Sequence, residues 1–448
     1  MVRRALSAAL AVAAVFGLAS ADAPTCGEGS KCPQDTPCCS AYNQCGVGAF
    51  CLGGCDPKYS HSLDSCYHAP SCKSGDFQLK TLDDVQTIDK YLGDASSINW
   101  VSQGKPVVYE DSLLLTMAEG TVGTLLSSTH YVWYGKICAK MTSSQGKGVV
   151  TAFIMMSDVK DEIDFEFIGV DIGNVQSNFY SQGVTVYTNS ANLTVGNTVE
   201  NVHEYCVDWQ EDTLTWSIDG DEMRSLKRSD TWNSTSKQFD YPQTPSRIML
   251  SLWPAGLPSN AKGTIEWAGG EIDWNSQYMQ NGYYYAMVKE VSVECYDAPP
   301  MAINKGSKAY QYTDIAATNN TVEINDDLVI LGSLYATGEE PDLGATTASN
   351  APKPTKSVDT VPGGNPGGGN RNEDSQSSAA ANNGGGGGGA TATNSAGGPA
   401  ATSNGGGSNG FQQGPSNQGS GTSLEPGLGK LSGSALAIVV AVLGLLVL

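Results

Sequence analysis

The feature that most constrains this chain is the alternation of acidic and bulky apolar residues at 162–166, which reads Glu-Ile-Asp-Phe-Glu. Successive side chains of a β-strand point to opposite faces, so a pattern with period two predicts a strand with one apolar and one acidic face. The side chains of Ile163, Phe165 and Phe167 are expected to point into a core. The pattern therefore assigns this segment to a sheet that is buried on one side.

The other face of the predicted strand carries three carboxylates in a row, those of Glu162, Asp164 and Glu166. Like charges placed this closely repel each other, so the row needs a reason. Glycoside hydrolysis supplies one, because it uses two carboxyl groups, one as nucleophile and one as acid/base. The pattern alone leaves two alternatives open: a solvated surface strand, and a calcium site in which Asp161, Glu162 and Asp164 supply hard oxygen ligands.

Between about Phe77 and Tyr296 the sequence reads as short strands separated by turn residues, without a sustained period of 3.6. Examples are the segments 131–137, 149–155 and 214–218, the last of which is closed by the hairpin turn Asp219-Gly220. Many strands at this spacing predict an all-β sandwich or jelly roll. Two curved sheets of this kind give a concave face that suits an extended sugar chain.

Both ends of the chain read as processing segments. Residues 1–21 have two arginines, an apolar stretch and the small residues Ala19-Ser20-Ala21, as in a secretory signal peptide. The apolar stretch 435–448 follows a polar spacer and small residues within 417–422, which predicts a GPI-anchor signal in 423–448. A single-pass anchor is the alternative, although the stretch is short for a span of about 20 residues.

The segment 346–422 consists mostly of Gly, Ser, Asn, Thr, Ala and Pro, which predicts a disordered stalk. A net charge of −21 without a basic patch argues against nucleic-acid binding, because phosphate contacts need clustered Lys and Arg. Sequons for N-glycosylation predict surface loops at Asn192, Asn233 and Asn319.

The 12 cysteines are unevenly distributed, with nine of them between Cys26 and Cys72. An even number in an oxidising compartment predicts disulfides. A module of about 40 residues needs such bridges because it cannot build a sufficient core. Seven cysteines lie at or before Cys55, so at least one pairs further along, and Cys66 and Cys72 are the nearest candidates.

The order of motifs after residue 160 resembles that of family 16 glycoside hydrolases, whose E-x-D-x-E motif matches 162–166 in its form without an extra bulge residue. Each further match is weak alone, but together and in this order they are specific. They are Gly169, Gln176-Ser177-Asn178, Trp216-Ser217-Ile218-Asp219-Gly220 with Arg224, Ser251-Leu252-Trp253, and Trp267-Ala268-Gly269-Gly270 with Asp273-Trp274.

The cysteine spacing from Cys26 to Cys55 resembles the hevein-type chitin-binding fold. That resemblance implies that Ser40, Tyr42 and Phe50 grip N-acetylglucosamine by a hydrogen bond and by stacking. This copy departs from the pattern, because Gln44 stands where an aromatic residue is usual and the loop before Cys51 is one residue shorter. A disulfide-held module without a ligand is the alternative.

Taken over nearly its full length, the chain resembles the fungal Crh/Utr cell-wall transglycosylases, a subgroup thought to join chitin to β-glucan. The resemblance implies a concanavalin-like β-sandwich, chitin and β-glucan as partners, and a GPI-anchored position at the cell surface and wall. We expect a monomer that uses no cofactor and no metal. The expected divisions are 1–21 signal, 22–72 disulfide-rich module, 73–300 catalytic sandwich, 301–345 extension of uncertain fold, 346–422 stalk and 423–448 anchor propeptide.

The same resemblance implies a role for each site residue. Glu162 is the expected nucleophile, Glu166 the acid/base that also contacts substrate, and Asp164 their assistant. Retaining chemistry places the two reacting carboxyl groups about 5–5.5 Å apart. The expected sugar-binding residues are Trp253 and Trp267 as stacking platforms, Thr264 toward the acceptor, and Gln176 and Asn178 toward the donor. An endo-hydrolase of chitin or β-glucan and a non-catalytic wall lectin are the competing interpretations.

Overall fold

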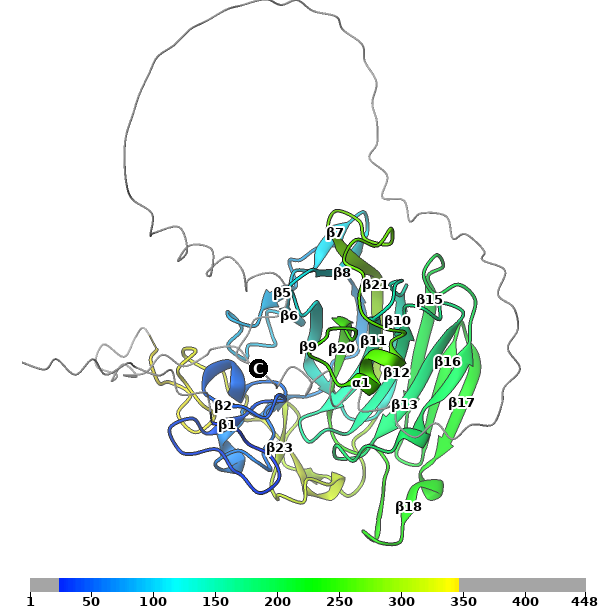
Figure 1. The fold of residues 1–448 in the computed structure, drawn as a ribbon. Coiled ribbons are helices and arrows are strands. Elements are labelled where there is room, and N and C mark those ends of the chain that lie inside the picture. Colours follow the sequence, from blue (N-terminus) through cyan, green and yellow to red (C-terminus); the bar gives the residue numbers. More distant parts are fainter. Residues whose placement is uncertain (1–23, 346–448) are drawn as a thin grey trace, which may run out of the picture.

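The structure, a computed structural model, describes residues 24–345 (Figure 1). The predicted signal peptide, stalk and anchor propeptide lie outside the described residues. Within the described range, no helix is both long and apolar enough to cross a membrane.

Two eight-stranded, largely antiparallel sheets pack face to face and confirm the predicted β-sandwich of jelly-roll type. Sheet A has the strand order β17-β16-β15-β10-β21-β8-β7, with β4 paired to β21. Its strands are β4 (Gly75–Gln78), β7 (Val107–Tyr109), β8 (Ser112–Ala118), β10 (Gly135–Met141), β15 (His203–Trp209), β16 (Thr213–Ile218), β17 (Asp221–Lys227) and β21 (Tyr283–Cys295).

Sheet B has the order β14-β13-β12-β11-β20-β9-β6-β5 and contains the acidic segment in β12. Its strands are β5 (Val85–Thr87), β6 (Trp100–Gln103), β9 (Thr124–Val132), β11 (Val149–Ser157), β12 (Glu162–Ile168), β13 (Asn174–Tyr180), β14 (Ala191–Thr194) and β20 (Ser246–Pro254). The short helix α1 (Lys262–Trp267) follows β20, and a small hairpin of β18 (Trp232–Asn233) and β19 (Gln238–Phe239) follows β17. The 3-10 turns are η1 (Gly48–Cys51), η2 (Leu63–Ser65), η3 (Tyr187–Asn189), η4 (Arg228–Thr231) and η5 (Asn319–Thr321).

The main core lies between the two sheets and is rich in aromatic side chains. Phe165 of β12 contacts Tyr205 of β15 edge-on, with ring centroids 5.5 Å apart, so this pair bridges the sheets. Phe153, Trp209 and Trp216 are fully buried beside them. Burying one large apolar side chain stabilises a fold by about 1.5–3 kcal/mol, so this layer fixes the position of β12 firmly.

Six disulfides use all 12 cysteines, which confirms the expectation from their even number. The N-terminal module holds four bridges: Cys26–Cys39, Cys32–Cys45, Cys38–Cys51 and Cys55–Cys66. Cys72 instead pairs with Cys295 at the end of β21, and Cys138 pairs with Cys206 across β10 and β15. The module also contains the strand pair β1 (Cys38–Cys39) and β2 (Cys45–Gly46).

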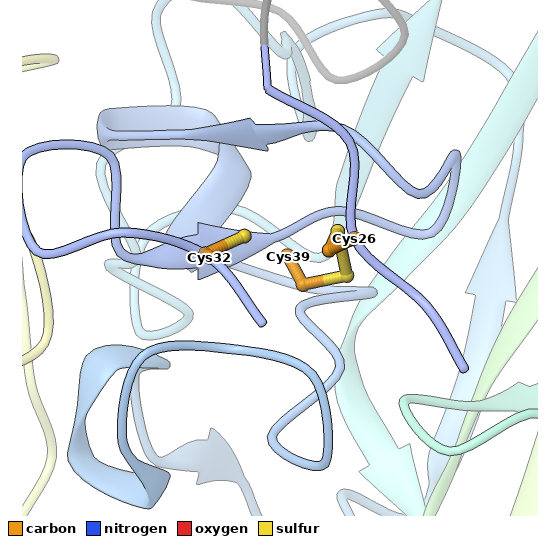
Figure 2. A group of neighbouring side chains, drawn as sticks. All are labelled: Cys26, Cys32 and Cys39. Atoms are coloured by element: carbon orange, nitrogen blue, oxygen red, sulfur yellow. A yellow bond between two sulfur atoms is a disulfide. The ribbon is translucent and has the colours of Figure 1, made fainter. Parts of the chain in front are cut away.

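The sulfur atoms of Cys26, Cys32 and Cys39 lie within 4.8 Å of one another (Figure 2). Figure 2 shows the Cys26–Cys39 bond directly, and Cys32 is bonded to Cys45. Each sulfur is therefore part of a disulfide, and the cluster has no thiolate to offer to a metal ion.

The extension 301–345 is folded against both the module and the sandwich. Its strands β22 (Ile303–Asn304), β24 (Val322–Asn325) and β23 (Ala309–Tyr312) form a sheet whose last member is β3 (Ala69–Pro70), from the end of the module. The Gly48 amide of the module donates to the Ala336 carbonyl at 2.8 Å, and the Leu331 amide donates to Leu92 of the sandwich at 2.8 Å. Figure 1 shows the module in blue beside the extension in yellow.

The three sequons differ in exposure. Asn192 is exposed but lies in the edge strand β14 rather than in a loop. Asn233 lies in β18 and is half-buried, with its amide donating to Asp240 at 2.9 Å. The prediction of a surface loop at Asn319 is wrong, because this side chain is only 4% exposed and its amide nitrogen is buried. A glycan needs an amide nitrogen that faces solvent, so we retain only Asn192 and Asn233 as glycosylation candidates.

Replacing Leu331 by Ala tests whether the extension belongs to the folded unit. Leu331 is 1% exposed and packs into the main core, so its loss should lower the free energy of unfolding by about 2–5 kcal/mol in urea titrations. Leu328→Ala is the control, because Leu328 is 46% exposed, and it should change the value by less than about 0.5 kcal/mol. Equal effects of the two substitutions would contradict an integral extension.

Candidate active site

Strand β12 has the two faces that its alternation predicts. Ile163, Phe165 and Phe167 are at most 1% exposed and belong to the main core. The opposite side carries Glu162, Asp164 and Glu166. These three acids form one row because residues two apart on a strand share a face.

The acidic row is buried rather than solvated. Glu162, Asp164 and Glu166 are 1%, 0% and 4% exposed, so the interpretation as an ordinary surface strand is wrong. Both carboxyl oxygens of Asp164, and one each of Glu162 and Glu166, are buried without a hydrogen-bond partner. Buried polar atoms are almost always paired, and exceptions gather at functional sites. The row is therefore a strong candidate for chemistry.

Burial is the main cause of the altered acidities in this row. It raises the pKa of Glu162 well above the ordinary range, and the Asp164 charge raises it further. Burial, then Asp164 and Glu162, likewise raise the pKa of Glu166 well above its usual value. The pKa of Asp164 rises to about 8 through burial, while the Arg224 guanidinium opposes this rise. The three groups therefore titrate as one coupled unit that retains protons at neutral pH.

Asp164, the middle residue of the row, is held in place by residues of sheet A. The Trp216 indole donates to the backbone carbonyl of Asp164 at 3.1 Å. Arg224 lies over the Trp216 ring, 4.5 Å from its centroid, and donates to the carbonyls of Ser177 and Asn189 at 2.9 and 2.7 Å. The hairpin of β16 and β17 thus supplies both a positional anchor and a positive charge.

Asp161, the residue before the row, has a structural role. Its two oxygens accept hydrogen bonds from the amides of Gln182, Gln243 and Thr244 at 2.8–3.0 Å, and from the Thr244 hydroxyl at 2.6 Å. A carboxylate that is saturated in this way is not available to a cation. The calcium interpretation, which relied on Asp161, is therefore not supported.

The expected sugar-binding residues on β13 lie beside the row. In the strand register, Gln176 is opposite Glu166 and Asn178 is opposite Asp164. The oxygen of the Asn178 side chain is buried and unpaired, like those of the carboxylates. Tyr180 lies opposite Glu162. Gln176, Asn178 and Tyr180 thus form a column of side chains on β13 beside the acidic row. Tyr180 is not among the residues predicted from the sequence, although its spacing of four from Gln176 on one strand places it on the same face.

The two expected stacking platforms lie together at the Glu166 end of the row. The rings of Trp253 and Trp267 are stacked, with centroids 6.2 Å apart and planes inclined by 24°. The Trp267 indole donates to the Gln176 side chain at 3.0 Å, which joins this pair to the column on β13. Thr264 lies one helical turn earlier, buried, with an unpaired hydroxyl. Trp274, in contrast, packs on Tyr284 beside the main core.

The residues expected to bind chitin in the N-terminal module are placed differently. Ser40 is buried and accepts from the backbone amides of Tyr42 and Gln44, both at 3.3 Å. Phe50 is 1% exposed within a cluster of disulfides, so it offers no ring face to a sugar, and we correct that expectation. Tyr42 is half-buried and lines a pocket that also contains Glu162.

Replacing Asp164 by Asn should change how stability depends on pH. The pKa of Asp164 is about 8 in the folded protein and about 3.9 in an unfolded chain, so the folded state holds more protons between these values. Stability is therefore greatest in acid and is lost as the pH rises through about 8. The free energy of unfolding, measured in urea, should fall in the parent between pH 5 and pH 8. In Asp164→Asn this fall should be smaller than in the parent by about 1–3 kcal/mol.

The exposed residue Asp35 supplies the control, since Asp35→Asn should leave the pH dependence of the parent unchanged. Equal losses between pH 5 and pH 8 in the parent and in Asp164→Asn would contradict a protonated, buried row.

Comparison with known proteins agrees with this geometry. A model of glycosyl hydrolases family 16 matches residues 94–269. Crh-like protein 2 of Aspergillus fumigatus is 51% identical over 374 residues, which cover 82% of this chain and 84% of that relative. Crh-like protein UTR2 of Candida albicans is 44% identical over 357 residues, covering 77% and 76% of the two chains.

Among solved structures, the apo Crh5 transglycosylase is 30% identical, with a TM-score of 0.49, and covers 60% of this chain and 100% of its own. The two Crh-like relatives match more than three quarters of this chain. The chain therefore belongs to the Crh-like proteins of glycosyl hydrolases family 16, carbohydrate-active enzymes of the cell wall.

Proposed function

We propose that this protein is a retaining transglycosylase that cleaves chitin and transfers the released chain to β-glucan. The observation that carries the proposal is the buried row of Glu162, Asp164 and Glu166, in which both carboxyl oxygens of Asp164 and one each of the two glutamates lack a hydrogen-bond partner. A retaining glycosidase needs one ionised and one protonated carboxyl group on a shared face, and a coupled buried trio supplies both. The long matches to the Crh-like relatives support an enzyme of this family, and transfer rather than hydrolysis is part of the proposal.

In the first step, the ionised carboxylate of Glu162 attacks the anomeric carbon of the donor sugar. The bond to the bridging oxygen breaks, its electron pair remains on that oxygen, and Glu166 gives up its proton there. The raised pKa of Glu166 keeps this proton available at neutral pH. Asp164 lies between the two, and its raised pKa of about 8 keeps it protonated at neutral pH. The Asp164 charge that would otherwise raise the pKa of Glu162 is then absent, so that Glu162 can ionise while Glu166 keeps its proton.

In the second step, Glu166 takes the proton of an acceptor hydroxyl while that oxygen attacks the anomeric carbon and releases Glu162. A sugar hydroxyl gives transfer, whereas water gives hydrolysis. The outcome depends on how well the acceptor is positioned ahead of water. The stacked rings of Trp253 and Trp267 beside Glu166 suit the apolar face of an acceptor sugar, and the unpaired Thr264 hydroxyl suits one of its polar groups. Gln176 and Asn178, which lie opposite Glu166 and Asp164 on β13, then hold sugar hydroxyls beside the row.

The finer location belongs to the same proposal. The signal-like segment 1–21, the stalk 346–422 and the anchor-like segment 423–448 support a GPI-linked enzyme at the plasma membrane that reaches into the wall. We also propose that the enzyme acts as a monomer, and that it requires neither a metal nor a cofactor, because the three carboxyl groups provide the chemistry.

The test is incubation with chitin oligomers and a fluorescent β-glucan oligosaccharide, with products resolved by mass. The parent should form labelled conjugates that are heavier by whole N-acetylhexosamine units. Glu162→Gln should form them at least about 10³-fold more slowly, because the nucleophile is lost. The exposed Glu200 supplies the matched control, and Glu200→Gln should retain the parent rate.

Two other results would overturn the proposal. Shortened chitin without any conjugate would indicate an endo-hydrolase. Sugar binding without products, unchanged in Glu162→Gln, would indicate a lectin.

A further inference from the structure

We infer that the N-terminal module, residues 24–72, is a fixed wall of the donor side of the active site, where Tyr42 contacts the chitin chain beyond the unit bonded to Glu162. This inference rests on the proposed function and adds to it. The alternative is a separate binding module that is carried beside the catalytic sandwich and captures substrate elsewhere.

A single pocket joins the module to the catalytic row. It is lined by Ala41, Tyr42, Gly53 and Gly54 of the module and by Glu162 of β12. From Glu162 it runs across sheet B, past Met156 of β11 and Met249 of β20, toward Val101 and Gln103 of β6. The pocket therefore crosses several strands from the nucleophile to the module, as an extended sugar chain would.

The pocket lies on the donor side of the reaction. Glu162 bonds to the donor sugar, whereas Glu166 protonates the oxygen of the leaving chain. Glu162 lines this pocket and Glu166 does not. The stacked pair Trp253 and Trp267 lies instead near Glu166, through the Gln176 contact. The two ends of the row thus face different surroundings, with aromatic platforms on one side and the module on the other.

The module is held rigidly at this place by buried polar contacts. The Gly54 amide donates to the Asp158 carboxylate at 2.8 Å, and the Tyr131 hydroxyl donates to the same oxygen at 2.7 Å. Gly53 lies flat against the guanidinium of Arg247, so closely that a Cβ atom at Gly53 would overlap it. Lys160 also donates to Asn43 of the module at 2.8 Å. Together with the extension, these contacts make the module a part of the pocket.

The lining suits an N-acetylated sugar chain. The side chains of Ile88, Leu125, Met156 and Met249 give an apolar surface for sugar C–H faces and acetamide methyl groups. Polar side chains also line the pocket, among them Lys160, Glu162 and Arg247. At the module end the Tyr42 hydroxyl donates to the Gln103 side chain at 3.3 Å. Ligand sites typically combine an apolar lining with a few placed polar groups.

The experiment measures chitin oligomers of increasing length, both as donors in the transfer reaction and as ligands of the inactive Glu162→Gln protein by calorimetry. Tyr42→Ala should weaken binding of long oligomers and raise their donor KM roughly fivefold to tenfold. Oligomers too short to reach Tyr42 should lose nothing, and the KM for the glucan acceptor should stay within about twofold of the parent value. Tyr42→Phe keeps the ring and should show a smaller effect.

Tyr335→Ala is the control for loss of a tyrosine, because Tyr335 is 43% exposed on the extension, and it should behave as the parent. A second pair of variants moves the module without changing Tyr42. A Cβ atom at residue 53 would overlap the Arg247 guanidinium, which is buried and donates to the Ser128 carbonyl at 2.9 Å. Because Arg247 is held in this way, Gly53→Ala should displace the wall and weaken long donors, whereas Gly173→Ala meets open space and should not.

Folded Tyr42→Ala and Gly53→Ala proteins with parental affinity for long oligomers, or with a loss that does not depend on length, would overturn the inference. A parent protein that forms no conjugate, while its binding of oligomers still depends on Tyr42, would be a different result. That result would contradict the proposed transfer but would support the inference that the module forms part of the donor site.

Discussion

The placement of three carboxyl groups in a row on one strand, out of contact with water, determines most of what this protein can do. At an effective dielectric constant of 20, two unit charges 4 Å apart interact by about 4 kcal/mol, so three ionised neighbours cannot coexist at little cost. The row relieves the repulsion by retaining protons, as the raised pKa values of Glu162, Asp164 and Glu166 indicate. A site that must hold both a proton and a charge is suited to acid/base chemistry with a nucleophile.

The rest of the structure keeps this unfavourable arrangement in place. Sheet A supports the row through the Trp216 hydrogen bond to the backbone of Asp164 and through the charge of Arg224. The saturated carboxylate of Asp161 fixes the start of β12. The unfavourable free energy of burying the acids is therefore offset by a large aromatic core and six disulfides rather than by local contacts of the acids. The module lines the pocket at the Glu162 end of the row, and the extension is joined to the module by the Gly48–Ala336 hydrogen bond.

The sequence predicted what short-range patterns encode. Period-two alternation identified β12 and both of its faces, and the even cysteine number predicted complete pairing. Contacts between segments that are distant in the sequence leave no comparable pattern in it. Gly54 meets Asp158 across 104 residues, and Gly48 meets Ala336 across a still longer separation, so the docking of the module could not be predicted. The sequon at Asn319 reads as a surface loop because a three-residue motif carries no information about what packs over it. Phe50 was misplaced for the same reason, since its burial depends on four bridged cysteines around it.

The most direct measurement of the central claim is mass spectrometry of a trapped glycosyl-enzyme. The Glu166→Ala variant lacks the base for the second step, but a chitin oligosaccharide with a good aryl leaving group needs no acid for the first, so the covalent sugar should accumulate. After acid quenching and proteolysis, we predict that the added mass lies on Glu162. A sugar found on Asp164 or on any other residue, or no adduct despite release of the aryl group, would contradict the account.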